Sequence, residues 1–120
     1  LILPGLWRAE KIQKKAAEAG FDWRDISGAL DKLDEETAEL RQAVRAGANI
    51  EEELGDVLFA AVKVGRFCGV DPETAVNNTC EKFIRRFRAM EEAVTAEGRS
   101  LSDMTLEEMT ALWNGAKKRS

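Results

Sequence analysis

The chain has 120 residues, of which 44% are hydrophobic and 33% are charged, and its formal net charge at pH 7 is −4. This balance is typical of a globular protein, and we expect one domain over residues 1–120. The negative charge argues against a nucleic acid polymer as partner, because sequence-independent affinity for DNA or RNA comes from clustered Lys and Arg. Histidine is absent, which excludes Ser/His/Asp and Cys/His catalysis and imidazole metal ligands. Any catalysis must therefore rest on carboxylates.

Several features bear on where the protein works. No apolar run approaches the ~20 residues of a membrane span, and the N-terminus lacks a secretory signal pattern. Cys68 and Cys80 form no CxxC pair and fall inside expected helices, which is typical of small core residues in a reducing compartment. We therefore expect a cytoplasmic protein with no membrane partner. The first residue is Leu1 rather than Met, which suggests a piece of a longer protein.

Hydrophobic residues recur at helical spacing along the chain, and helix is the only regular structure that they predict. The five expected helices cover residues 6–19, 26–46, 50–68, 72–97 and 106–116. Their expected N-terminal caps are Asp25, Asn49 with Glu52, Asp71 before Pro72, and Thr105 with Glu108. The fourth helix has an apolar stripe that we expect in the core: Val76, Cys80, Phe83, Phe87, Met90 and Val94.

Two pairs of acids lie on consecutive expected helices. Glu36 and Glu39 are three residues apart in one helix, and Glu53 and Asp56 are three apart in the next. Residues three apart share a helix face, so each pair presents two carboxylates to one point. A connection of only a few residues makes the helices antiparallel neighbours, so the pairs can meet. Because four converging carboxylates repel one another without a cation, the spacing outlines a metal site.

Helical projection separates the acids of the first pair from their neighbour. Glu36 lies at the edge of the apolar face, Glu39 lies further round on the same flank, and Glu35 points away. Lys32 falls between Glu36 and Glu39 in angle, where it can offset their charge or reach a phosphate.

The second pair falls in an apolar helix. Projection places Glu53 and Asp56 in a largely buried sector, whereas Lys63 and Arg66 hold the polar side. A buried carboxylate needs a cation, a basic partner or a raised pKa. The alternative for both pairs is that they are solvated faces of ordinary charged helices.

A site built only from carboxylates selects hard cations such as Mg²⁺, Mn²⁺ or Ca²⁺ over zinc. Lys82 and Arg86, four residues apart on the fourth helix, offer the positive charge that a polyphosphate needs on its other side. The alternative is that they form salt bridges with the acids. By its pattern, Trp113 is a core residue, although its indole could stack on a base.

The motifs together resemble the MazG family of nucleoside triphosphate pyrophosphohydrolases. EExxE and ExxD occur in order, with KIQKKA and GFDW before them and GVDPE and EKFIRRF after them. The resemblance covers residues 3–113. It implies an all-α, four-helix-bundle-like fold that works as a homodimer, with Mg²⁺ as cofactor and Mn²⁺ as a possible substitute. The implied reaction is hydrolysis of nucleoside triphosphates to monophosphate and pyrophosphate, by water attack at the α-phosphorus.

The resemblance also implies roles for single residues. The implied metal ligands are Glu36, Glu39, Glu53 and Asp56. The implied substrate contacts are Lys32 and Glu35 near the nucleotide, Lys82 and Arg86 at the phosphates, and Trp113 at the base. We choose Glu39 as the catalytic base among the four similar acids. The start at Leu1 fits the C-terminal catalytic half of a tandem family member.

Two other functions stay open from the sequence. One is a narrower pyrophosphatase that acts on a single or modified nucleotide, because pocket shape sets that choice. The other is a non-catalytic helical dimer that binds nucleotide or serves as a scaffold. Loss of the acids would abolish activity in the first case and would be tolerated in the second.

Overall fold

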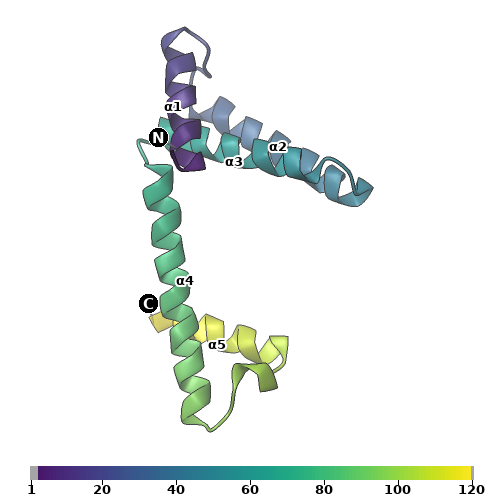
Figure 1. Cartoon of the computed structure of the whole chain (residues 1–120), viewed down its shortest axis with the longest axis vertical. Helices are drawn as coiled ribbons and strands as arrows, with labels where there is room; N and C mark the ends of the chain where they lie inside the picture. Colours follow the sequence, from purple (N-terminus) through teal and green to yellow (C-terminus); the bar gives the residue numbers. More distant parts are fainter. Residues whose placement is uncertain (1–2, 120) are drawn as a thin grey trace. The chain divides into compact units, whose positions relative to one another are not determined.

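The computed structural model describes residues 3–119, and every regular element in that range is helical (Figure 1). The elements in chain order are α1 (Gly5–Glu18), α2 (Ile26–Ala46), α3 (Ile50–Phe67), α4 (Pro72–Ala96), the short 3-10 helix η1 (Leu101–Asp103) and α5 (Leu106–Arg119). The predicted all-α fold class is confirmed. Among residues 3–119, no helix combines the length and the apolar character that crossing a bilayer requires.

Most of the predicted helix caps are present. Asp25 accepts a hydrogen bond from the Gly28 N–H at 3.2 Å and begins α2. At α5 the Thr105 N–H donates to Glu108 Oε1 at 3.0 Å, and the Glu108 N–H donates to Thr105 Oγ1 at 3.1 Å, which is a complete capping box. The capping box predicted at Asn49 is wrong, because Asn49 has a φ of 61° and makes no side-chain cap. This left-handed residue closes the tight turn between α2 and α3 instead.

The chain divides into two compact units, Leu1–Ala75 and Val76–Ser120. The expected single domain over residues 1–120 stays a prediction. In the first unit, α2 and α3 run side by side in opposite directions, and α1 packs against α3 (Figure 1). The core of this unit contains small side chains, with Ala29 0%, Ala60 5% and Val62 3% exposed. Such small residues let helix backbones approach closely.

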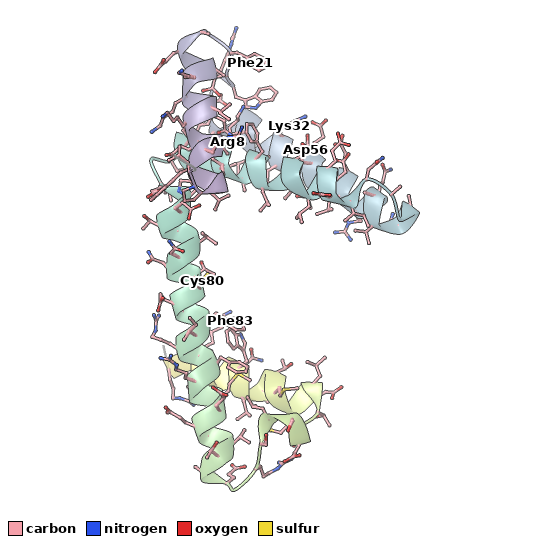
Figure 2. The ribbon with its side chains drawn as sticks, viewed as in Figure 1. Arg8, Phe21, Lys32, Asp56, Cys80 and Phe83 are labelled. Atoms are coloured by element: carbon pink, nitrogen blue, oxygen red, sulfur yellow. The ribbon has the colours of Figure 1, made fainter. Side chains whose placement is uncertain are left out.

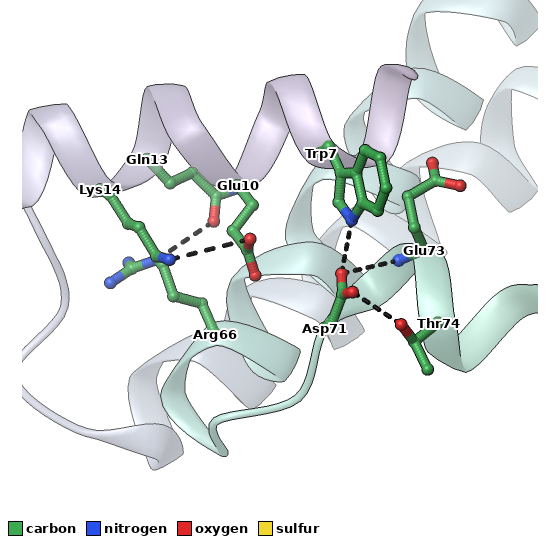
Figure 3. Close-up of polar contacts among 8 residues, drawn as sticks. All are labelled: Trp7, Glu10, Gln13, Lys14, Arg66, Asp71, Glu73 and Thr74. Carbon is green, nitrogen blue, oxygen red and sulfur yellow. Dashed lines mark hydrogen bonds and ion pairs between the residues drawn. The ribbon is translucent and has the colours of Figure 1, made fainter. Parts of the chain in front are cut away.

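Polar contacts join α1 to the neighbouring segments of the first unit (Figure 3). The Trp7 indole N–H donates to Asp71 Oδ1 at 2.6 Å, and Asp71 also accepts from the Glu73 N–H and from the Thr74 hydroxyl. The predicted cap at Asp71 is therefore present, and it ties the first turn of α4 to α1. The hydrogen bonds from Thr74 and Trp7 lower the pKa of Asp71.

The second unit has a smaller core than its sequence pattern predicts. Met90 and Val94 are buried, as expected, together with Ala116 of α5. Phe83 remains 54% exposed, although its ring lies 5.1 Å from that of Trp113. The expectation that Val76, Phe83 and Phe87 lie in the core is wrong, since Val76 is 41% exposed and Phe87 is 38% exposed as well. Within this unit only η1 and α5 are available to cover α4, and two short elements bury only part of a long stripe.

The two cysteines also differ from their predicted positions. Cys68 and Cys80 are both exposed free thiols, so the prediction that they are core residues is wrong. Cys68 follows the last residue of α3, where the helix ends at Gly69 with a φ of 69°. Cys80 lies in the stretch 74–85 of α4, whose residues are all exposed.

Candidate active site

Carboxylates from α2 and α3 gather into two overlapping groups in the first unit. Glu36, Glu53 and Asp56 each offer one oxygen, and these oxygens lie within 4.8 Å of one another. Glu35, Glu36 and Glu39 form a second group by the same measure. The structure thus brings Glu36 of α2 together with Glu53 and Asp56 of α3, because the turn at residues 47–49 sets the two helices antiparallel. Glu36 belongs to both groups and is their common member.

Two oxygens of this cluster are buried without a partner. Among residues 3–119, Glu36 Oε2 and Glu53 Oε2 have no solvent contact and no hydrogen bond. A buried charged oxygen without a hydrogen bond is costly, and a divalent cation would remove that cost. Carboxylates alone suit a hard, oxygen-seeking cation, so the residues fit Mg²⁺ or Mn²⁺.

The burial of the acids is uneven. Glu36 is 7% exposed and Glu53 is half-buried, as projection predicted. Asp56 is exposed, so the prediction that it is largely buried is wrong. Its position seven residues before Lys63 places both on one face of α3. An exposed carboxylate beside buried ones leaves the cluster accessible from outside.

Lys32 meets two of the acids. Its Nζ lies 2.9 Å from Glu36 Oε1 and 3.5 Å from Glu35 Oε1. The hydrogen bond to Glu36 raises the pKa of Lys32 and lowers the pKa of Glu36, so this pair is ionised at neutral pH. Lys32 therefore offsets charge in the cluster, which is one of the two roles that projection predicted for it.

Glu39 has the opposite shift. Its hydrogen bond with Glu36 and the negative charge of that residue raise the pKa of Glu39, and burial and the charge of Glu53 add to the effect. Like charges held together favour one protonated member. The raised pKa is a property that suits a proton acceptor, because a base works best when its pKa approaches the ambient pH.

A pocket of about 440 Å³ lies beside the acids. Ligand sites in proteins commonly have volumes of ~300–1,000 Å³. Lys32 and Asp56 stand at this pocket on adjacent helices, and Phe21 comes from the loop between α1 and α2 (Figure 2). The residues that line it are Phe21, Asp22, Trp23, Ala29, Lys32, Glu36, Asp56, Phe59, Ala60 and Lys63. Acids, two lysines and three aromatic rings therefore share one cavity.

The sequence analysis did not predict several of the residues that line this pocket. It assigned no role to Phe21, Trp23 or Phe59, and it placed Lys63 on a polar side away from Asp56. The heptad spacing of Asp56 and Lys63 was a signal for their shared face. The aromatic pair in the loop GFDW was a signal too, since exposed aromatics in loops often contact ligands.

Long-range contacts hold the aromatic loop against α3. Arg66 Nη2 donates to Asp22 Oδ1 at 2.7 Å, and the same oxygen accepts the Trp23 N–H at 2.9 Å. Arg66 Nε also donates to Gln13 Oε1 at 3.4 Å (Figure 3). The buried Gln13 in turn donates to the Phe59 carbonyl at 2.9 Å. The hydrogen bond from Arg66 lowers the pKa of Asp22.

Lys82, Arg86 and Trp113 belong to the second unit. There the Arg86 guanidinium carbon lies 5.7 Å from the centroid of the Trp113 ring, and Phe83 also contacts this ring. Trp113 is thus half-buried by its own unit, as its core-like pattern suggested. Their predicted roles in substrate binding stay predictions.

Comparisons with known proteins bear on this site. The family model for the MazG nucleotide pyrophosphohydrolase domain matches residues 24–90, which include the acids and most of the pocket. The chain is 40% identical over 116 residues to the nucleoside triphosphate pyrophosphohydrolase/pyrophosphatase MazG of Thermotoga maritima, covering 97% of this chain and 45% of the relative. It is 44% identical over 121 residues to the nucleoside triphosphate pyrophosphohydrolase of Escherichia coli, covering 98% of this chain and 46% of the relative.

A shorter match is to a protein of Bacillus subtilis named Uncharacterized protein YabN. It is 50% identical over 70 residues, covering 58% of this chain and 14% of that protein. The chain therefore spans less than half the length of each of these relatives.

Proposed function

Because the chain belongs to the MazG nucleotide pyrophosphohydrolase family, we propose that it hydrolyses nucleoside triphosphates to the nucleoside monophosphate and pyrophosphate. The observation that carries the proposal is the pair of buried oxygens of Glu36 and Glu53 without hydrogen bonds. A cluster that needs a divalent cation, beside a pocket large enough for a nucleoside, suits phosphoanhydride hydrolysis. Nucleoside triphosphates as substrates would place this activity in the cytoplasm.

The carboxylates would hold the cofactor. Glu36, Glu53 and Asp56 would bind Mg²⁺, or Mn²⁺ as a substitute, and Glu39 would complete the set. When bound, the ion neutralises phosphate charge and increases the acidity of water. Lys32 would keep Glu36 ionised and oriented through their 2.9 Å ion pair.

The proposed reaction is attack of water on the α-phosphorus. The bond from the α-phosphorus to the oxygen that bridges to the β-phosphate breaks, and pyrophosphate leaves with that oxygen. Glu39 would accept the proton from the attacking water, a role that its raised pKa supports. The aromatic pocket beside the cluster would hold the nucleoside and exclude bulk water from it.

We also propose that the protein works as a dimer. Leu54 and Leu58 lie one turn apart on α3 and are 46% and 49% exposed. Adjacent exposed leucines on a helix favour burial against another surface, and a second copy of the chain is the partner that symmetry supplies most simply.

The reaction is tested by product analysis. We would incubate the protein with ATP and dTTP, with and without Mg²⁺, and separate the products by anion exchange. Monophosphate plus pyrophosphate, formed only with Mg²⁺, is the expected result. Asp56→Asn should reduce turnover by at least about 100-fold, because a ligand of the metal is lost, whereas Glu52→Gln, an exposed acid on the same helix, should not.

Other products would change the proposal. Diphosphate plus phosphate would mean attack at a different phosphorus. If ATP and dTTP are not hydrolysed but one other nucleotide is, the narrow pyrophosphatase would be favoured. No turnover of any nucleotide, with Asp56→Asn unchanged in binding, would favour the non-catalytic module.

A further inference from the structure

The pocket extends along α3 away from the acids. Asp56 stands at the acidic end, and Lys63 lies seven residues further on, about 10 Å along the helix axis. Ala60 and Ala29, both small and buried, also line the pocket. A nucleotide with its α-phosphate at the carboxylates would therefore point its base toward Lys63. This placement rests on the proposed function.

Asp22 faces the same end of the pocket as a fixed hydrogen-bond acceptor. Both of its observed hydrogen bonds, from Arg66 and from the Trp23 N–H, end on Oδ1. Within the described part of the chain, Oδ2 thus remains available to a ligand. Its side chain is only 19% exposed, and the Arg66 side chain that holds it is 13% exposed. The acceptor is therefore oriented before any ligand arrives.

Lys63 supplies the complementary donor. An ammonium group has three N–H donors and no acceptor. Lys63 and Asp22 both line this pocket. Lys32, the other lysine of the pocket, is engaged with Glu36 at the acidic end. The far end thus presents one donor-only and one acceptor-only side chain, in a pocket that Phe21 and Trp23 also line.

We propose that Lys63 and Asp22 read the edge of the base and favour bases that carry a carbonyl oxygen beside a ring N–H. Uracil, thymine, guanine and hypoxanthine have this edge, so Lys63 would donate to the carbonyl and Asp22 would accept from the ring N–H. Adenine and cytosine present an amino group beside an unprotonated ring nitrogen. In the same position, adenine or cytosine would place its amino group against the Lys63 ammonium and its unprotonated ring nitrogen against the Asp22 carboxylate. Neither contact is a hydrogen bond, and polar groups left unpaired in this way are costly.

Substrate pairs that differ only at this edge test the proposal. ITP and ATP form such a pair, and so do UTP and CTP. In the wild-type protein we expect kcat/KM to be about tenfold or more higher for ITP than for ATP, and for UTP than for CTP. Lys63→Met should reduce each ratio by at least about fivefold, because kcat/KM should fall further for ITP and UTP than for ATP and CTP. Lys63→Arg, which keeps the donors, should retain part of the preference.

A matched control and a second readout sharpen the test. Lys11→Met removes an exposed lysine of α1 outside the pocket and should leave both ratios unchanged. Binding of IMP and AMP, measured by calorimetry without metal, reports the preference without turnover. IMP could bind more tightly than AMP, with the difference abolished in Lys63→Met, while no nucleotide is hydrolysed. That result would support base recognition by Lys63 and contradict the proposed reaction.

Two results would overturn the inference. One is a wild-type ratio near one for both pairs, in turnover and in binding. The other is an equal loss for all four triphosphates in Lys63→Met, which would make Lys63 a phosphate contact instead. If Lys63→Met loses its helical circular dichroism, the wild-type ratios and Lys63→Arg still decide between these outcomes.

Discussion

Glu36 combines three environments in one side chain. One oxygen accepts from Lys32 at 2.9 Å, the other is buried without a partner, and the carboxylate has an oxygen within 4.8 Å of a Glu39 oxygen. The lysine keeps Glu36 ionised, while Glu36 in turn raises the pKa of Glu39. Neighbouring carboxylates are thereby driven toward different protonation states, an arrangement that can separate a ligand from a base.

Glu53→Gln tests whether the buried oxygens await a cation. In the wild type we expect Mg²⁺ or Mn²⁺ to raise the melting temperature in a concentration-dependent way, because a ligand that binds only the folded state stabilises it. The variant should lose most of this increase, since it loses one of the clustered oxygens. Thermal unfolding with and without metal measures both, with Glu52→Gln as the control. An equal metal effect in all three proteins would contradict the metal site.

Asp22→Asn tests the ion pair that holds the aromatic loop. The pKa of Asp22 is lowered in the folded protein, so its ionisation stabilises the fold at pH values above the unfolded pKa of about 4. This stabilisation is lost as the pH falls through the lowered pKa. We expect the variant to be about 1 kcal/mol less stable at pH 7, with the difference shrinking at pH 3 and below. Urea unfolding at several pH values measures this, and a pH-independent difference would count against the ion pair.

The α2–α3 hairpin is the element that assembles the site. Gly47 ends α2 with a φ of 67°, and the N–H groups of Gly47 and Ala48 return to the carbonyls of Val44 and Ala43. Asn49 then begins α3 from a second left-handed conformation. This tight reversal sets Glu36 opposite Glu53, and it depends on backbone angles rather than on packing.

Two glycines of this hairpin form a matched pair. A Cβ added at Gly47 or at Gly55 would meet no atom within 4 Å, but only Gly47 has a positive φ. We expect Gly47→Ala to destabilise the protein by about 1 kcal/mol, because alanine is strained in that conformation. Gly55→Ala, inside α3, should stabilise it by about 0.5–1 kcal/mol. Chemical denaturation gives both values, and shifts of the same sign would contradict this account of the turn.

At the scale of the whole molecule, little of the apolar surface is buried. Among residues 3–119, the buried apolar residues are Ala29, Ala43, Ala60, Val62, Met90, Val94 and Ala116, most of which are small. Many larger side chains stay substantially exposed, among them Leu54, Leu58 and Phe83. Exposed apolar area of this kind is typical of a protein that buries it in an assembly.

Leu58→Lys tests the proposed dimer. A charge placed on the exposed leucine face of α3 should weaken association, because it cannot be buried against a second copy without a partner. We expect light scattering after gel filtration to give a dimer for the wild type and a mass shifted toward the monomer for the variant. Glu51→Lys introduces the same charge on the same helix at an exposed acid and should remain dimeric. A monomeric wild type would refute the proposal.

The sequence alone determined the features that depend on local chemistry. The caps at Asp25, Asp71 and Thr105 were predictable because they join residues within one helical turn. The helical period also predicted that Glu36 and Glu53 would face one another. At Asn49 the same reasoning failed, because the geometry of the turn outweighed the preference of the side chain for capping.

Only the tertiary structure decided what surrounds the acids. Phe21, Trp23 and Lys63 meet in one pocket because Arg66 binds Asp22, a residue 44 positions away in the chain. The burial of the Glu36 and Glu53 oxygens and the exposure of Asp56 likewise follow from how α2 lies on α3. Helical periodicity acts over a few residues, whereas burial and pocket walls arise from contacts between segments far apart in the chain. The local sequence therefore predicted the carboxylates that can bind a metal, but it did not predict the cavity beside them.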